Sequence, residues 1–158
     1  MAVISKCTES NRLLRAATDN DLLAIQALLA SHGLPYQDCA SHLHNFLVLE
    51  SANKIVAVGG LELYTKQALL RSLAVASECI GQGLGDMLYR ALCDTARQHG
   101  VEQLFVLTTT AVTYFTARGF MSIDRNDVPE AIKNTRQFSA LCPQSAVVLR
   151  RVVRREID

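Results

Sequence analysis

A glycine-rich stretch is the part of this sequence best suited to chemistry. Gly81, Gly83 and Gly85 alternate with Gln82 and Leu84, directly before a segment of helical spacing. Glycine lacks the side chain that would keep a ligand from the backbone, and the first amides of a helix have no intrahelical acceptor. These amides and the positive end of the helix dipole favour a phosphate group. The stretch therefore predicts an anion-binding loop; the alternative is a turn whose glycines only permit close packing.

The residues after the loop predict a helix that begins near Leu84 and is ended by Gly100. Its apolar residues recur every three or four positions and so share one face. They are Leu84, Met87, Leu88, Ala91, Leu92 and Ala96. Before the loop, the apolar run from Leu73 to Ala76 predicts a buried strand. The loop thus connects a strand to a helix.

The glycine spacing distinguishes this loop from other phosphate-binding motifs. A dinucleotide fingerprint needs glycine at the third position after Gly83, where Asp86 stands, and no Gly-Lys-Ser/Thr of a P-loop follows. The stretch Ile80–Gly85 instead resembles the acetyl-CoA signature of the GCN5-related N-acetyltransferases, Arg/Gln-x-x-Gly-x-Gly/Ala. Ile80 occupies the position of the usual Arg or Gln. The resemblance implies acetyl-CoA as the co-substrate.

The rest of the chain alternates between strand and helix patterns. Strands are predicted at residues 13–17, 46–49, 55–58, 61–64, 69–75, 104–107, 121–123 and 146–149. Thr18 is expected to cap one further helix, and residues 111–118 form a short one. Gly59 and Gly60 predict a bulge or kink. Together these elements predict an α+β fold: a mostly antiparallel twisted sheet with one parallel crossover and helices on both faces.

Composition indicates one domain over residues 1–158, with a core at about 12–153 and a loose arm at 1–11. Hydrophobic residues make up 49% of the chain and charged residues 20%, which argues against disorder. The net charge of +1 provides no electrostatic basis for binding nucleic acid or an anionic membrane. No apolar run is long enough to cross a bilayer, so we expect a cytoplasmic protein.

Cysteine and histidine spacing predicts no metal site. The five cysteines are odd in number and include no Cys-x-x-Cys pair, which predicts reduced thiols. They are Cys7, Cys39, Cys79, Cys93 and Cys142. His42 and His44 complete no recognised ligand spacing with the nearby Asp38 and Cys39. We expect these histidines at the surface or in a substrate loop.

The C-terminal strand runs into a basic cluster, Arg150–Arg155. Such a cluster could contact a CoA phosphate or RNA. The alternation of basic and apolar residues favours instead a solvated face on an edge strand that discourages sheet pairing.

The order of the elements extends the resemblance to about residues 13–153. Leu70–Val75 and Leu107–Thr109 look like the N-acetylglutamate-synthase type of domain, and Asp127–Ile132 and Phe138–Ala146 are similar to arsenic-resistance-associated N-acetyltransferases. The resemblance implies direct transfer of an acetyl group from acetyl-CoA to an amine in a ternary complex.

The resemblance also assigns residues to the cofactor. These are Leu73, Ala74, Val75, Ile80, Gly81, Gln82, Gly83, Leu84, Gly85, Thr110, Tyr114 and Phe115. The superfamily commonly has Tyr-x-x-x-Gly-Phe in the last segment, and that tyrosine protonates the departing thiolate. Phe115 occupies the tyrosine position here, and Tyr114 lies about 100 degrees around the helix from it. The identity of the general acid is therefore left undecided.

Direct attack needs a base for the amine and a donor for the oxyanion. The resemblance implies Glu62 as the base, directly or through a water, and the backbone amide of Val75 as the donor. A substrate carboxylate would bind Arg71 or Arg136. The neutral donors near it are Ser72, Thr108 and Thr109. The alternatives are a solvent-facing Glu62, a pair between Arg71 and Glu62 across the hairpin, and an Arg136 that only decorates a helix.

These assignments predict an N-acetyltransferase for a small amino-acid-like amine. The candidates are glutamate, phosphinothricin and an arsenic-containing glutamate analogue, the last of which implies arsenic resistance. The alternative is a non-catalytic acyl-CoA-binding sensor or partner domain, which Ile80 and Phe115 favour. Expected partners are the small-molecule amine and, as an open alternative, a second copy in a homodimer, without nucleic acid or membrane.

Overall fold

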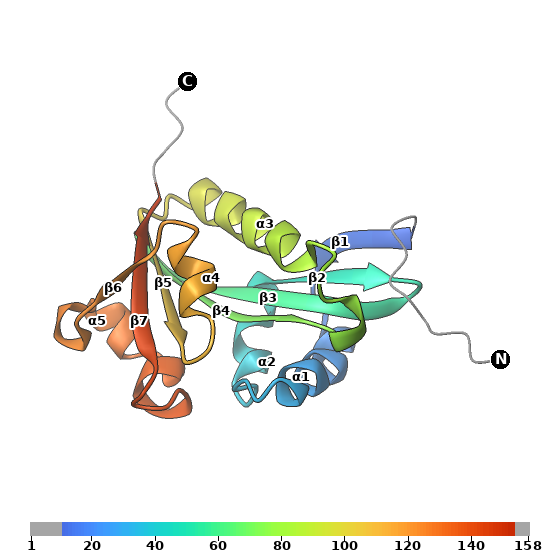
Figure 1. Cartoon of the computed structure of the whole chain (residues 1–158), viewed down its shortest axis with the longest axis horizontal. Coiled ribbons are helices and arrows are strands. Elements are labelled where there is room, and N and C mark those ends of the chain that lie inside the picture. Colours follow the sequence, from blue (N-terminus) through green and yellow to red (C-terminus); the bar gives the residue numbers. More distant parts are fainter. Residues whose placement is uncertain (1–10, 154–158) are drawn as a thin grey trace, which may run out of the picture. The chain divides into compact units, whose positions relative to one another are not determined.

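The computed structural model describes residues 11–153 and contains a seven-stranded mixed sheet of order β1-β2-β3-β4-β5-β7-β6 (Figure 1). The strands are β1 (Arg12–Ala16), β2 (Phe46–Ser51), β3 (Lys54–Tyr64), β4 (Gln67–Val75), β5 (Gln103–Thr108), β6 (Met121–Ile123) and β7 (Val147–Val152). The α-helices are α1 (Leu22–Ser31), α2 (Cys39–His42), α3 (Leu84–Gln98), α4 (Val112–Thr116) and α5 (Glu130–Lys133). Strands β4 and β5 are parallel. The predicted α+β class is confirmed.

The N-terminal arm predicted before residue 12 lies outside the described residues except for Asn11, and Arg154 and Arg155 also lie outside them. Among the described residues, no helix combines the length and the apolar character needed to cross a membrane.

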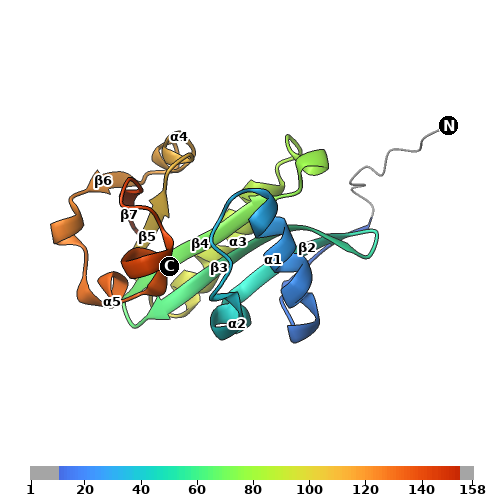
Figure 2. The ribbon, with the colours of Figure 1, turned by 90° about the horizontal axis from the view of Figure 1, so that it is seen from below.

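The described chain divides into two compact units, residues 11–60 with 72–92 and residues 61–71 with 93–153. In the first unit, Val48 and Val58 are paired on β2 and β3 and belong to the cluster that contains α1 residues. The next pair, Leu49 and Ala57, belongs to the cluster that contains α3 residues. Successive strand residues point to opposite faces, so α1 and α3 cover opposite faces of this unit (Figure 2).

Within the described pairing of β2 with β3, the register continues through Gly59 and Gly60 and shifts instead between Leu49 and Glu50. A Cβ at Gly60 would lie 2.3 Å from the Phe46 ring, and one at Gly59 would lie 2.8 Å from Leu92. Close packing, rather than a bulge against β2, therefore explains these two glycines.

In the second unit, β7 pairs with β5 along Val147–Val152 and with β6 along Val148–Arg150. The expectation that this basic strand is an edge strand is therefore wrong. The short β6 covers the side of β7 that faces away from β5 and takes the edge position itself. One hydrophobic cluster in the core of this unit contains Leu69, Phe105, Val128, Ile132 and Val148.

The prediction of reduced thiols is wrong for Cys79, which is disulfide-bonded. Cys39, Cys93 and Cys142 are free, and Cys7 lies outside the described residues. A disulfide depends on the distance between Cα atoms in the fold, which sequence spacing does not reveal.

An ion-pair network ties β1 to the start of α1. The Arg15 guanidinium donates to both carboxylate oxygens of Asp21, at 2.6 and 2.9 Å, and its Nε donates to Glu50 at 2.8 Å. The Thr18 amide donates to Asp21 Oδ2 at 2.7 Å, which completes the predicted cap. The hydrogen bond from Arg15 holds the pKa of Asp21 at about 2, below its ordinary 3.8.

We expect Asp21→Asn to lower the free energy of unfolding at pH 7 by about 1 to 2 kcal/mol. Because the pKa of Asp21 is depressed in the folded state, its stabilisation is full above the ordinary pKa of 3.8 and is lost as pH falls through about 2. Urea denaturation at pH 7, 4 and 2.5 should therefore show a smaller acid-induced loss in the variant. An equal loss in both proteins would contradict this role of Asp21.

Candidate active site

The glycine loop is exposed, and the residues on either side of it are buried. Cys79 and Leu84 are buried and belong to one hydrophobic cluster of the first unit, whereas Ile80 to Gly83 are exposed. Gly81 has a φ of +90° and Gly83 a φ of +79°, and a Cβ at either residue would meet no atom within 4 Å. The left-handed backbone conformation of these two residues favours glycine. Close packing does not require glycine here, because no neighbouring atom would clash with a Cβ. The alternative explanation of the loop, glycines kept only for close packing, is therefore excluded for these two residues.

The start of α3 provides donors beside this open space. The Met87 amide donates to the Gly83 carbonyl at 3.1 Å, so the helix begins at Leu84. The amides of Leu84 and Gly85 precede that first hydrogen bond and have no intrahelical acceptor. Open space in front of a glycine backbone, next to helix-start amides, fits a phosphate group of coenzyme A.

Strand β4 leads into the loop and is irregular. Among the described residues, its parallel pairing with β5 is confined to Gln67–Leu69. Ser72 then has a φ of +59°, a left-handed conformation rare for a residue with a side chain. Ala74 is buried in the cluster that contains α1 residues, and Val75 packs against the cluster that contains α3 residues. Because α1 and α3 cover opposite faces, the two side chains alternate between faces. The role of the Val75 amide stays a prediction.

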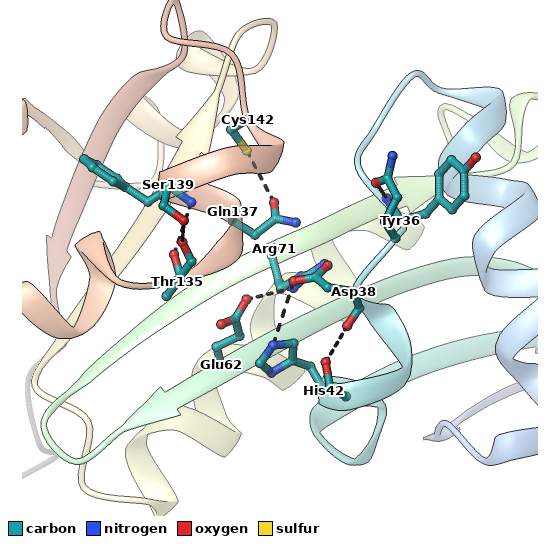
Figure 3. Close-up of polar contacts among 12 residues, drawn as sticks. Tyr36, Asp38, His42, Glu62, Arg71, Thr135, Gln137, Ser139 and Cys142 are labelled. Carbon is teal, nitrogen blue, oxygen red and sulfur yellow. Dashed lines mark hydrogen bonds and ion pairs between the residues drawn. The ribbon is translucent and has the colours of Figure 1, made fainter.

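In the second unit, Glu62 and Arg71 form a buried ion pair (Figure 3). Arg71 Nη1 lies 2.7 Å from Glu62 Oε2, and each side chain is 1% exposed. The Tyr64 hydroxyl donates to Glu62 Oε1 at 2.5 Å. The hairpin pair considered for Arg71 is thus present, and the solvent-facing Glu62 is excluded. Tyr64 was missed, although its place two residues after Glu62 on one strand puts both side chains on the same face.

Of the three threonines predicted as site residues at the end of β5, one stabilises a turn and two are exposed. Thr108 Oγ1 accepts hydrogen bonds from the amides of Ala111, at 2.9 Å, and Thr110, at 3.3 Å, and so stabilises the turn before α4. Thr109 and Thr110 are exposed.

Phe115 is buried, with its ring centroid 5.3 Å from that of Phe120. The Arg118 guanidinium lies 3.5 Å from the centroid of the Tyr114 ring. Phe115 therefore serves the core of the second unit, and its assignment to the cofactor stays a prediction, as does that of Tyr114.

Arg136 is exposed and directly precedes a π-helical turn, η6 (Gln137–Leu141). Gln137 is only 5% exposed, and its Oε1 accepts a hydrogen bond from the Cys142 thiol at 3.4 Å (Figure 3). The sequence reasoning singled out Arg136 but missed the buried Gln137. π-Helical turns often lie at functional sites, but no sequence pattern predicts them.

Comparison with known proteins identifies the family. Residues 13–122, more than half of the chain, match the sequence model of the acetyltransferase (GNAT) family. This chain belongs to that family. The match includes the glycine loop and the strand segments that carry Glu62 and Arg71, so the predicted GNAT membership is confirmed.

Curated relatives of this GNAT chain are amino-acid acetyltransferases. The protein from Pasteurella multocida is 29% identical over 131 residues, which cover 77% of this chain and 30% of the relative. The protein from Mannheimia succiniciproducens is 34% identical over 88 residues, which cover 54% of this chain and 20% of the relative. The chain therefore spans less than a third of the length of these relatives.

Solved structures share the GNAT fold. N-acetylglutamate synthase from Neisseria gonorrhoeae, complexed with coenzyme A and N-acetyl-glutamate, has a TM-score of 0.79 at 24% identity, covering 94% of this chain and 36% of that one. Rv2747 from Mycobacterium tuberculosis, in complex with CoA, has a TM-score of 0.75 at 20% identity, covering 90% of this chain and 99% of that one.

Proposed function

We propose that this domain is an acetyl-CoA-dependent N-acetyltransferase that acts on the amine of a small amino acid or analogue. Glutamate-like compounds are the first candidates, including phosphinothricin and arsenic-containing analogues. The observation that carries the proposal is the exposed loop from Ile80 to Gly83, whose glycine backbone faces open space at the start of α3. The amino-acid acetyltransferases among its relatives support an amino-acid acceptor.

Acetyl-CoA would supply the acetyl carbonyl, and residues of this chain would prepare the amine. An ammonium group must lose a proton before it can attack, and Glu62 would accept that proton directly or through a water. Arg71 and Tyr64 each engage one oxygen of this carboxylate and so fix its orientation. The Val75 amide would donate to the developing oxyanion.

Calorimetric titration with acetyl-CoA and CoA tests the cofactor site, and release of free CoA in the presence of glutamate-like amines tests turnover. One-site binding with amine-dependent release supports the enzyme. Binding without release for any amine supports the acyl-CoA sensor, which the exposed Ile80 and the buried Phe115 favour. Absence of binding would contradict both functions.

Arg71→Lys is expected to raise the KM for an anionic amine acceptor by about 10- to 100-fold, with a change below about threefold for acetyl-CoA. Lysine retains the charge opposite Glu62, so the protein should fold, but it lacks the planar fork that binds a carboxylate through two hydrogen bonds. Arg97→Lys is the matched control, because Arg97 pairs with Asp94 at 2.9 Å on α3. Equal effects of Arg71→Lys on both KM values would indicate a purely structural arginine.

A further inference from the structure

The cofactor loop carries no cation of its own. The segment Ser77–Asp86 contains two carboxylates, Glu78 and Asp86, and neither lysine nor arginine. Ile80 replaces the usual Arg or Gln with an apolar side chain that is 64% exposed. A ligand with several phosphate charges therefore needs positive charge from another element.

Two cations from other strands of the first unit reach this loop. Lys54, at the start of β3, places Nζ 3.5 Å from Glu78 Oε1 and so offsets a carboxylate. Arg12, at the start of β1, donates from Nη2 to the side-chain oxygen of Gln82. Gln82 lies between the two glycines whose backbone faces open space.

The contact of Arg12 is with a neutral amide, so it leaves the positive charge of the guanidinium uncompensated by Gln82. Its Nε is buried and has no hydrogen-bond partner among the described residues. A guanidinium stays protonated at all physiological pH values and forms short paired hydrogen bonds with phosphate oxygens. Arg12 thus supplies at the loop the charge that Ile80 lacks.

We propose that Arg12, at the start of β1, is a phosphate-binding residue of the coenzyme A site, where the signature position carries the apolar Ile80 in place of the usual Arg or Gln. This inference rests on the proposed function, because it requires acetyl-CoA at the glycine loop. Gln82, two residues before Leu84, accepts a hydrogen bond from the guanidinium. The phosphate oxygens would accept from Arg12 and from the helix-start amides of Leu84 and Gly85.

Binding of acetyl-CoA to Arg12→Gln tests the proposal, because glutamine keeps a donor and removes the charge. The expected result is a Kd about 10- to 100-fold higher than in the wild type, with a weaker dependence of Kd on salt concentration. With S-acetyl-pantetheine, a donor without phosphate, kcat/KM should change less than about twofold. Arg90→Gln is the matched control, since Arg90 is exposed on α3 and its loss changes the net charge equally.

Ile80→Arg in the Arg12→Gln background restores the cation at the signature position and should recover most of the affinity. A recovery would also show that Arg12→Gln folds. Equal losses with acetyl-CoA and S-acetyl-pantetheine, or an unchanged Kd, would overturn the role of Arg12. A wild type that does not bind acetyl-CoA would instead contradict the proposed function itself.

Discussion

Glu62→Gln is expected to lower kcat/KM for the amine by about 10²- to 10³-fold and to change the affinity for acetyl-CoA by less than about threefold. Glutamine has nearly the shape of glutamate but cannot accept a proton from an ammonium group at neutral pH. The carboxylate is 1% exposed and held on both oxygens, by Arg71 and Tyr64. Steady-state kinetics and calorimetry on the same preparation measure the two effects.

Removal of one partner from a buried ion pair also destabilises the fold, by about 3 to 5 kcal/mol. Thermal denaturation must therefore show that Glu62→Gln is folded at the assay temperature. Tyr64→Phe is the matched control, because it removes only the hydrogen bond to Oε1 and should cost about tenfold or less in kcat/KM.

The pH dependence separates a base from a structural carboxylate. If Glu62 accepts the proton of the amine, its removal should change the shape of the pH profile of kcat/KM. A purely structural Glu62 would lower the rate at every pH and leave the profile unchanged. An unaltered rate in a folded variant would remove Glu62 as the base.

Local periodicity was enough to predict the elements that hold the loop. Buried Leu84, Leu88 and Leu92 recur at helical spacing, and Gly100, at a φ of +75°, ends α3 as expected. The order of the elements likewise predicted helices on both faces, and residues of α1 and α3 pack on opposite faces of β2 and β3. These features depend on residues that are close in the sequence, so they can be predicted from the sequence alone.

The features that the sequence did not predict depend on contacts between distant residues. The interior position of β7 requires its pairing with β6, and the left-handed Ser72 lies in a run with ordinary strand residues on either side. The pair of Arg71 with Glu62 was stated only as an alternative, and the folded structure shows that it forms. The hydrogen bond from Arg12 to Gln82 is between residues 70 positions apart in the sequence, and no sequence motif predicts it.

Gly83→Glu should weaken binding of acetyl-CoA by more than about 100-fold, because it places a negative charge where phosphate groups are expected. A Cβ at Gly83 would meet no atom within 4 Å, so the glutamate side chain would start in the space that the ligand needs. Calorimetric titration with acetyl-CoA measures the loss. Retained affinity would contradict the assignment of the loop.

Backbone strain is the competing explanation, since any side chain at a φ of +79° costs about 1 to 2 kcal/mol. Gly33 provides the control: its φ is +68°, a Cβ there also meets no atom within 4 Å, and it follows α1 rather than the loop. Gly33→Glu should therefore lower the melting temperature as much as Gly83→Glu and leave acetyl-CoA binding unchanged. Gly83→Ala carries the strain without the charge, and we expect it to weaken binding by about fivefold or less. A loss of binding that follows the charge at residue 83, and not the strain at either glycine, identifies a site for an anion.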